Sequence, residues 1–237
     1  MKIIRLFYIF IFLLFSCGLE TYVFLEPVPN PNIVAFNSVT FYLPSRSSQP
    51  AEFRHYLIYY RIYLSDHTPA ATPIASQIWQ INSALAAHFD NLSVLTTNDI
   101  VSAALVMSEF NRYSYFQLHI ENSTGDIDNI YSLLTTDGLV SIDFTPDNIG
   151  PFVSVNSGPN YPLIRPNMVN PRPQDNNSFF NNDVLSLELD QGINLDVHEH
   201  GNPNNSYVSM YIVAFGIDSN YSPIYSRATH IGIFLLP

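Results

Sequence analysis

The sequence predicts a mainly β protein built from antiparallel strands, and three observations lead to that prediction. Several short runs alternate apolar and polar residues with a period of two, which is the pattern of a half-buried strand. The chain of 237 residues has 17 prolines and only nine glycines, so proline-stiffened turns are expected between the strands. Apolar residues make up 47% of the chain, which is enough for one packed domain.

The first 16 residues have the layout of a secretory signal. Lys2 and Arg5 supply positive charge, and the run 6–15 is uninterrupted and apolar. A run of this length is too short to cross a bilayer as a permanent helix. A cationic start, a short apolar run and a small residue at its end are typical of an exported precursor. The only cysteine of the chain, Cys17, follows directly.

The motif Leu14-Phe15-Ser16-Cys17 resembles the lipobox of bacterial lipoproteins, with Phe15 in place of the usual small or aliphatic residue. Relaxed lipoboxes of this kind are typical of spirochaetes, and the leader with the segment 17–22 resembles uncharacterised treponemal lipoproteins. The resemblance implies a signal peptide over 1–16 and lipidation of Cys17, for example with palmitate. It places the protein in the bacterial envelope, on the outer membrane or the periplasmic face. The alternative is an ordinary secretory signal with a chance cysteine.

The segment 17–32 reads as a lipidated, proline-rich tether that ends where one domain, 33–237, begins. Pro27, Pro29 and Pro31 alternate with other residues and favour an extended, semi-rigid path. Such a tether lifts the domain off the membrane. In the alternative interpretation, its aromatic residues Tyr22 and Phe24 pack on the edge of the domain.

Charge excludes several classes of partner. Without Lys2 and Arg5 the nine basic residues become seven, against twenty acidic residues, a net charge of about −13. A surface of this kind repels phosphate groups, so nucleic-acid binding is not expected. Attachment to a membrane must therefore come from the lipid on Cys17 and not from a basic patch.

Strands are predicted in order along the chain. In the strongest, 55–64, even-numbered positions from Tyr56 to Leu64 share one face, and odd-numbered positions from His55 to Tyr63 share the other. Aromatic and β-branched residues dominate it, as is typical of strands. The other predicted strands cover residues 39–43, 113–121, 139–144, 184–189, 207–217 and 230–235.

One helix is predicted between the strand 55–64 and the strand 113–121. Thr72 suits the N-cap and Pro73 suits the first helical position. Apolar residues then recur at helical spacing, and the helix is expected to end near Phe89. The apolar stretch 100–107 fits a helix or a strand.

Three segments resemble a fibronectin type III domain. The run 56–62 is similar to its third strand, while 207–215 and 230–234 are similar to its last two, with Tyr207 in the place of the tyrosine-corner residue. The resemblance implies an immunoglobulin/fibronectin-like antiparallel sandwich. A plain module needs only about 100 residues, so 65–206 is expected to be a large insertion containing the helix.

Two short clusters of aspartate and histidine residues resemble parts of metal sites. On an extended strand Asp196, His198 and His200 project from the same face, and imidazole with carboxylate suits zinc or a similar transition metal. In the alternative interpretation these residues simply face water beside the turn 201–205. The segment 126–129 resembles half a calcium loop but lacks the remaining ligands, so a plain hairpin turn between Glu121 and Ile130 is predicted instead.

The stretch 146–183 is the candidate partner-binding loop, because it is rich in proline, asparagine and serine and holds no strand of convincing length. Long loops without regular structure are often binding elements. Aromatic residues and arginine are favoured at interfaces, and here they are Phe152, Tyr161, Arg165, Arg172, Phe179 and Phe180. In the alternative interpretation, this excursion packs back on the sandwich through the same aromatic rings.

These observations predict a non-enzymatic envelope lipoprotein that binds another envelope component or a host protein, or has a structural role. No Gly-x-Ser-x-Gly motif and no phosphate-binding glycine-rich loop is present, so no catalytic residue and no cofactor is assigned. The alternative function is a carbohydrate-binding or metal-dependent module. In the carbohydrate version, sugars stack on the strand face that carries Tyr59, Arg61 and Tyr63.

Overall fold

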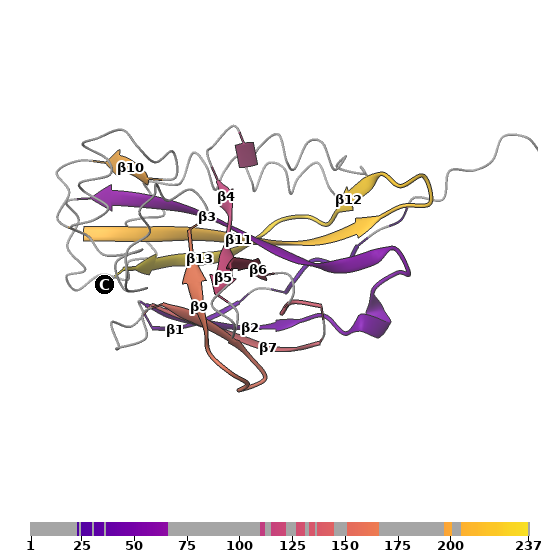
Figure 1. Ribbon diagram of the computed structural model, residues 1–237, viewed down its shortest axis with the longest axis horizontal. Coiled ribbons are helices and arrows are strands. Elements are labelled where there is room, and N and C mark those ends of the chain that lie inside the picture. The colour runs from indigo at the N-terminus through magenta and orange to yellow at the C-terminus, as the bar shows by residue number, and fades with distance from the viewer. Residues whose placement is uncertain are drawn as a thin grey trace, which may run out of the picture.

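A computed structural model of the chain describes residues 23, 25–29, 31–35, 37–65, 110–111, 115–121, 127–130, 133–135, 137–144, 151–165, 197–200 and 205–236. Within these residues the protein is mainly β, and its strands form two sheets in which nearly all neighbours are antiparallel. The prediction of a mainly β, antiparallel protein is confirmed. Figure 1 shows the two sheets, with β3, β11 and β13 in one and β1, β2 and β7 in the other.

The first sheet has seven strands in the order β1-β2-β7-β8-β9-β5-β6, and every neighbouring pair is antiparallel. Its strands are β1 Asn32–Ala35, β2 Ser38–Leu43, β5 His119–Glu121, β6 Ile127–Asn129, β7 Gly138–Asp143, β8 Phe152–Val155 and β9 Tyr161–Ile164. The antiparallel pairing of Glu121 with Ile127 agrees with the hairpin predicted between Glu121 and Ile130, although 127–129 form strand β6 and residues 122–126 lie outside the described residues.

The second sheet is centred on two long strands that pair along most of their lengths, β3 (Phe53–Ser65) and β11 (Asn205–Ile217). β13 and β12 both pair with β11, β4 pairs with β3, and β10 lies parallel to β3. These shorter strands are β4 Phe116–Gln117, β10 Val197–His200, β12 Pro223–Tyr225 and β13 Thr229–Leu235. One 3-10 helix, η1 (Arg46–Ser48), joins β2 to β3.

The strand predicted over 113–121 is divided between the two sheets. Phe116 and Gln117 pair with β3, whereas His119 and Ile120 pair with β9 in the other sheet. Between them, the Leu118 amide donates to the Ile58 carbonyl at 2.8 Å. The alternation of faces was predicted correctly, because Leu118 and Ile120 are both buried in the core. The prediction of one continuous strand was wrong, because the chain changes sheets at Leu118.

One hydrophobic core lies between the facing sides of the two sheets. Each buried aliphatic or aromatic side chain contributes about 1.5–3 kcal/mol to stability, so this layer holds the sheets together. The first sheet contributes Val39, Phe41, Leu43, Val140, Ile142 and Val153, and the second contributes Tyr56, Ile58, Tyr60, Ile62, Val208, Met210, Ile212, Ala214, Ile231 and Phe234. Gly232 (φ +148°) lies under the Phe234 ring, which would block any side chain there.

The opposite side of the second sheet is also covered. The outer aromatic cluster consists of buried side chains from β3, β11 and the segments around 110 and 115, namely Leu57, Tyr59, Phe110, Tyr115, Tyr211 and Val213. The Tyr59 and Phe110 rings stack with centroids 4.3 Å apart. The central strands are therefore buried on both faces along most of their length, which fits the absence of acidic residues from β3 and of any charged residue from β11.

Tyr207 lies on this outer side and not in the core between the sheets. Its neighbours Val208 and Met210 are core residues, while Tyr207 packs with Ile233 and Leu235. A tyrosine-corner residue lies on the same strand face as the core residue two positions later. The assignment of Tyr207 to that role was therefore wrong.

Part of the predicted tether belongs to the domain. Leu25 and Val28 are buried in the core, and the Val28 carbonyl accepts a hydrogen bond from Thr229 Oγ1 at 2.7 Å. The chain is thus packed on the sheets before β1 begins. Tyr22 and Phe24, the residues named in the alternative interpretation, lie outside the described residues, as do the predicted helix 72–89, the stretch 100–107 and the strand 184–189.

Candidate functional site

The N-terminal segment enters the domain beside η1. Gln49, which follows η1, holds this segment with both ends of its amide: its Nε2 donates to the Glu26 carbonyl at 2.8 Å, and its Oε1 accepts from the Glu26 amide at 3.0 Å. Gln49 Nε2 also donates to the Tyr56 hydroxyl at 3.0 Å. One buried side chain therefore fastens the incoming chain to β3. We call this arrangement the Gln49 clamp.

The Tyr56 hydroxyl at the base of the clamp stays protonated at all ordinary pH values. Burial raises its pKa to about 12, and the nearby carboxylates of Glu26 and Asp137 add to that rise. As a neutral phenol it donates toward the Pro44 carbonyl at 3.5 Å while it accepts from Gln49. The clamp is therefore independent of pH over the physiological range.

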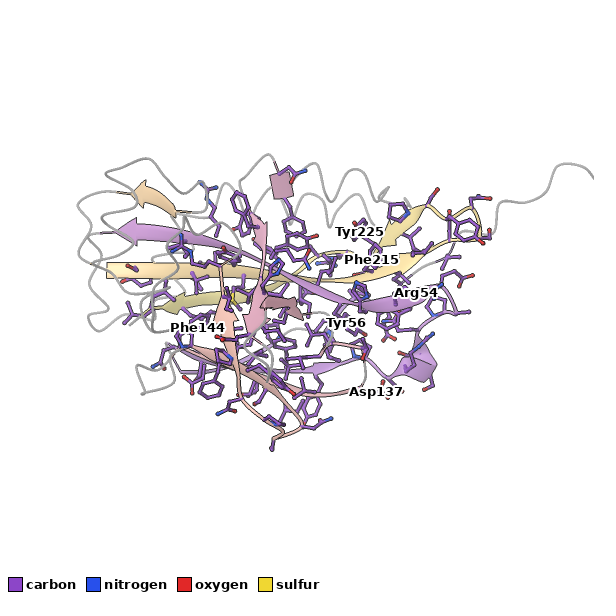
Figure 2. All side chains as sticks on the ribbon, in the orientation of Figure 1. Arg54, Tyr56, Asp137, Phe144, Phe215 and Tyr225 are labelled. Atoms are coloured by element: carbon purple, nitrogen blue, oxygen red, sulfur yellow. The ribbon has the colours of Figure 1, made fainter. Side chains whose placement is uncertain are left out.

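Asp137 fixes η1 against the start of β7. Its carboxylate accepts hydrogen bonds from the Ser45 hydroxyl at 2.9 Å and from the Arg46 amide. The Arg46 guanidinium lies 5.3 Å from the Phe53 ring centroid and donates to the Pro50 carbonyl at 3.0 Å. Figure 2 labels Asp137 and Arg54 in the half of the molecule that also holds η1.

The β11–β12 turn lies at the same end. The Ile217 amide donates to the Glu52 carbonyl at 3.0 Å, which joins the turn to the residues that follow η1. Within the turn, Asp218 Oδ1 accepts from the amides of Asn220 and Ser222, both at 2.8 Å. Tyr221, between them, has a φ of +60° and a side chain that is 90% exposed. We call η1, residues 49–53 and the turn 218–222 together the entry end.

The proposed sugar-stacking face is not open at Tyr59. Tyr59 is only 4% exposed and its ring is stacked on Phe110. Burial raises the pKa of its hydroxyl well above the usual range. No sugar ring can reach this face of Tyr59, so the prediction of a stacking platform was wrong at this residue. The side chain of Tyr63 lies outside the described part of the structure.

A serine–histidine pair lies beneath the outer aromatic cluster. Ser209 Oγ is 3.4 Å from His230 Nε2 and 3.1 Å from the Tyr115 hydroxyl, and the His230 and Tyr211 rings are 4.6 Å apart. Burial lowers the pKa of His230 to about 4. A nucleophile must be reachable by its substrate, and Ser209 is fully buried. The geometry is that of a structural hydrogen-bond chain.

The structure describes the backbone of two of the three predicted metal ligands. His198 and His200 lie in β10, in parallel register with Tyr63 and Ser65 of β3. Because they are two residues apart in a strand, they share one side of the sheet. Asp196 lies outside the described residues. Among the residues that are described, no three metal-binding side chains come together.

The candidate partner-binding loop contains two strands that sequence reasoning did not find. β8 and β9 extend the first sheet, and Tyr161 packs against the core. Arg165 is 1% exposed, while Phe152 is half-buried. The segment 152–165 therefore packs back on the sheet, as in the alternative interpretation. Arg172, Phe179 and Phe180 lie outside the described residues.

The Gln49 clamp and Tyr221 were not found from the sequence. Gln49 has no motif, because its role depends on a backbone segment 23 residues earlier. The turn itself was readable in Asp218, Asn220 and Pro223, which are common turn residues. The exposure of Tyr221 was not readable, since all the other tyrosines that the structure describes, except Tyr115, lie in strands.

The comparisons with known proteins identify no relative: no protein family, no curated protein and no solved structure matches this chain. Cys17 lies outside the described residues. Within the described part, no helix has the length and apolar character needed to cross a membrane.

Proposed function

We propose that this protein is a bacterial envelope lipoprotein, anchored by lipid on Cys17, with a non-enzymatic binding or structural role. The observation that carries the proposal is the position of Cys17. It closes a cationic and apolar leader, and it precedes Leu25, the first of the described residues that is buried in the core. An anchor at Cys17 therefore leaves the folded domain intact and facing water.

The composition supports lipid as the means of attachment. The chain has a net charge of −11, and Lys2, in the leader, is its only lysine. Basic residues contribute about 1 kcal/mol each to binding at anionic membranes, and this chain has few to contribute. Acyl chains contribute about 0.8 kcal/mol for each buried methylene, which makes a multiply acylated cysteine a firm anchor.

Replacement of the cysteine tests the proposal. Cys17→Ser should abolish incorporation of labelled palmitate and leave uncleaved precursor or soluble protein, whereas the wild type should partition into the detergent phase. The matched control is Ser16→Ala, which keeps a small residue before Cys17 and should leave lipidation unchanged. A wild-type protein that incorporates no palmitate and stays in the aqueous phase would contradict the proposal.

We also propose that the two sheets form an elaborated immunoglobulin/fibronectin-like sandwich. The order β1-β2-β7 in one sheet and β3-β11-β13 in the other supports it, because it matches the A-B-E and C-F-G strands of that fold in both sequence order and antiparallel pairing. β10 departs from the pattern, since it is parallel to β3. An experimental structure with a different strand order would refute this proposal.

Partner binding is proposed for the part of the loop beyond Arg165. Phe152 and Tyr161 are in strands of the first sheet, so their substitution would mix loss of binding with loss of stability. The combined variant Arg172→Ala, Phe179→Ala and Phe180→Ala should reduce capture of an envelope or host protein in a pull-down. Capture equal to that of the wild type, with the same melting temperature, would remove this segment from consideration.

A further inference from the structure

The direction of the N-terminal segment shows at which end of the domain the anchor is attached. Glu26 is bonded to Gln49, at the level of Tyr56 in β3. Val28 is bonded to Thr229, which pairs with Ile212 and lies further along the sheet. The chain therefore runs away from the entry end as residue numbers rise. Followed backward from Val28 to Leu25, it runs toward the entry end.

The connection between Cys17 and the entry end is short. Residues 18–24 join Cys17 to the buried Leu25, and a fully extended chain of that length spans at most about 30 Å. The entry end is consequently the part of the domain that stays closest to any lipid carried by Cys17. Figure 1 shows the β11–β12 turn and η1 at this end, opposite β10.

Tyr221, at the entry end, has a backbone conformation and an exposure to water that are both unfavourable for a tyrosine. Its φ of +60° lies in the left-handed region, which costs a side chain other than glycine about 1–2 kcal/mol and which asparagine or glycine occupy more easily. Its ring is also 90% exposed to water. Neither the backbone conformation nor the packing of the described residues accounts for a tyrosine at this position. A contact of Tyr221 with something outside the domain would account for it.

The chemistry of the entry end suits a bilayer surface. Tyrosine is enriched at membrane–water interfaces, where the ring lies at the level of the headgroups. The carboxylates of Asp137 and Asp218 accept hydrogen bonds from the protein's own groups. Arg46 and Arg54 are exposed nearby; each donates to backbone carbonyls of this end through Nη1, and its other N–H groups can contact lipid phosphates.

We propose that the entry end faces the bilayer that holds the Cys17 lipid and that Tyr221 inserts into its headgroup region. This inference rests on the proposed lipid anchor. The domain then stands with its sheets roughly upright on the membrane, and the far end, with β10, points away from it.

Site-specific quenching by lipid tests the orientation. The full chain, expressed with its leader and purified from membranes, is reconstituted into phosphatidylcholine vesicles that contain lipids with a doxyl quencher near the headgroup. With the Cys17 thiol consumed by lipid, Tyr221→Cys provides a single thiol for an environment-sensitive fluorophore. The matched control is Tyr42→Cys, since Tyr42 is also exposed, at 66%, but lies on the open face of β2.

We expect quenching and a blue shift at position 221 and neither at position 42. An unquenched label at 221, or equal quenching at both positions, would overturn the inference. Labelled palmitate is measured in the same preparation. Palmitate present with an unquenched label at 221 overturns the orientation alone, whereas absence of palmitate overturns the lipid anchor and the orientation together.

Discussion

Two tyrosines that are close in sequence, Tyr211 in β11 and Tyr221 in the turn after it, have opposite surroundings. Tyr211 is 2% exposed, and its ring meets the Tyr115 ring edge-on at 5.3 Å and the His230 ring at 4.6 Å. Tyr221 is 90% exposed and has a left-handed backbone. The first stabilises the fold, and only the second is available for recognition.

Most of the described aromatic side chains of this chain are, like Tyr211, packed inside the fold. The described rings on the outer side of the second sheet are packed against each other, and Tyr59 among them is closed to a stacking ligand. A tyrosine that is available for a contact with a partner or a membrane is instead Tyr221, in the turn 218–222.

Removal of a ring from the outer aromatic cluster should destabilise the fold strongly. Phe110 is fully buried, stacks on Tyr59 and lies near Tyr115 and Tyr211. Phe110→Ala should lower the free energy of unfolding by about 3–5 kcal/mol, through lost burial and the cavity left behind. Urea denaturation measures it, and Phe110→Leu should cost clearly less. A loss below about 1 kcal/mol would mean that the outer side is not a packed layer.

Loss of the Gln49 clamp should have an intermediate effect. Gln49→Ala leaves the backbone groups of Glu26 without their side-chain partner and should cost about 1–3 kcal/mol. Proteolysis near residues 25–29 should become faster than in the wild type. The exposed Ser48→Ala provides the control and should change stability by less than about 1 kcal/mol. Equal proteolysis in both variants would show that other contacts hold the segment.

Acid should weaken the domain through His230. Its folded-state pKa is about 4, below the ordinary value of 6.5, so the unfolded chain binds more protons between these values. Stability from this group is complete above pH 6.5 and is lost as the pH falls toward 4. His230→Gln, which can still bond Ser209, should show a shallower fall of melting temperature across this window. An unchanged slope would show that His230 is hydrated in the folded protein.

Substitution of Tyr221 should have the smallest effect on stability, and of opposite sign. Tyr221→Asn relieves the left-handed backbone and should raise the free energy of unfolding by up to about 1 kcal/mol. The same change should reduce contact with the membrane, as expected for a residue kept for function at the expense of stability. Tyr42→Asn, with an extended backbone in β2, should not be stabilising. A marked destabilisation by Tyr221→Asn would show that Tyr221 packs on the domain.

The long central strands were predictable from sequence because their alternation is dense and local. β3 and β11 satisfy it over many residues, and the two faces predicted for β3 are the two packed sides that the structure has. The segments that cover the two sides were not predictable from the alternation, since aromatic residues occupy both. Phe110, which covers Tyr59, is far away in sequence.

Short strands were harder to predict because partners decide them. β8 and β9 have only four residues each and were read as loop, since Pro162 and the flanking prolines mask the alternation. Their strand character comes from pairing with β7 and with each other. In the same way, the burial of Leu25 and Val28 depends on a side chain, Gln49, whose position follows from η1 and not from any local pattern.

Anchoring of the domain by Cys17 can be read from the N-terminus of the mature protein. Protein purified from bacterial membranes after expression with its own leader should give, by mass spectrometry, an N-terminal peptide that begins at Cys17 and carries acyl chains. That result would establish the anchor from which the orientation of the entry end follows. A peptide that begins elsewhere, or an unmodified Cys17 thiol, would contradict the account.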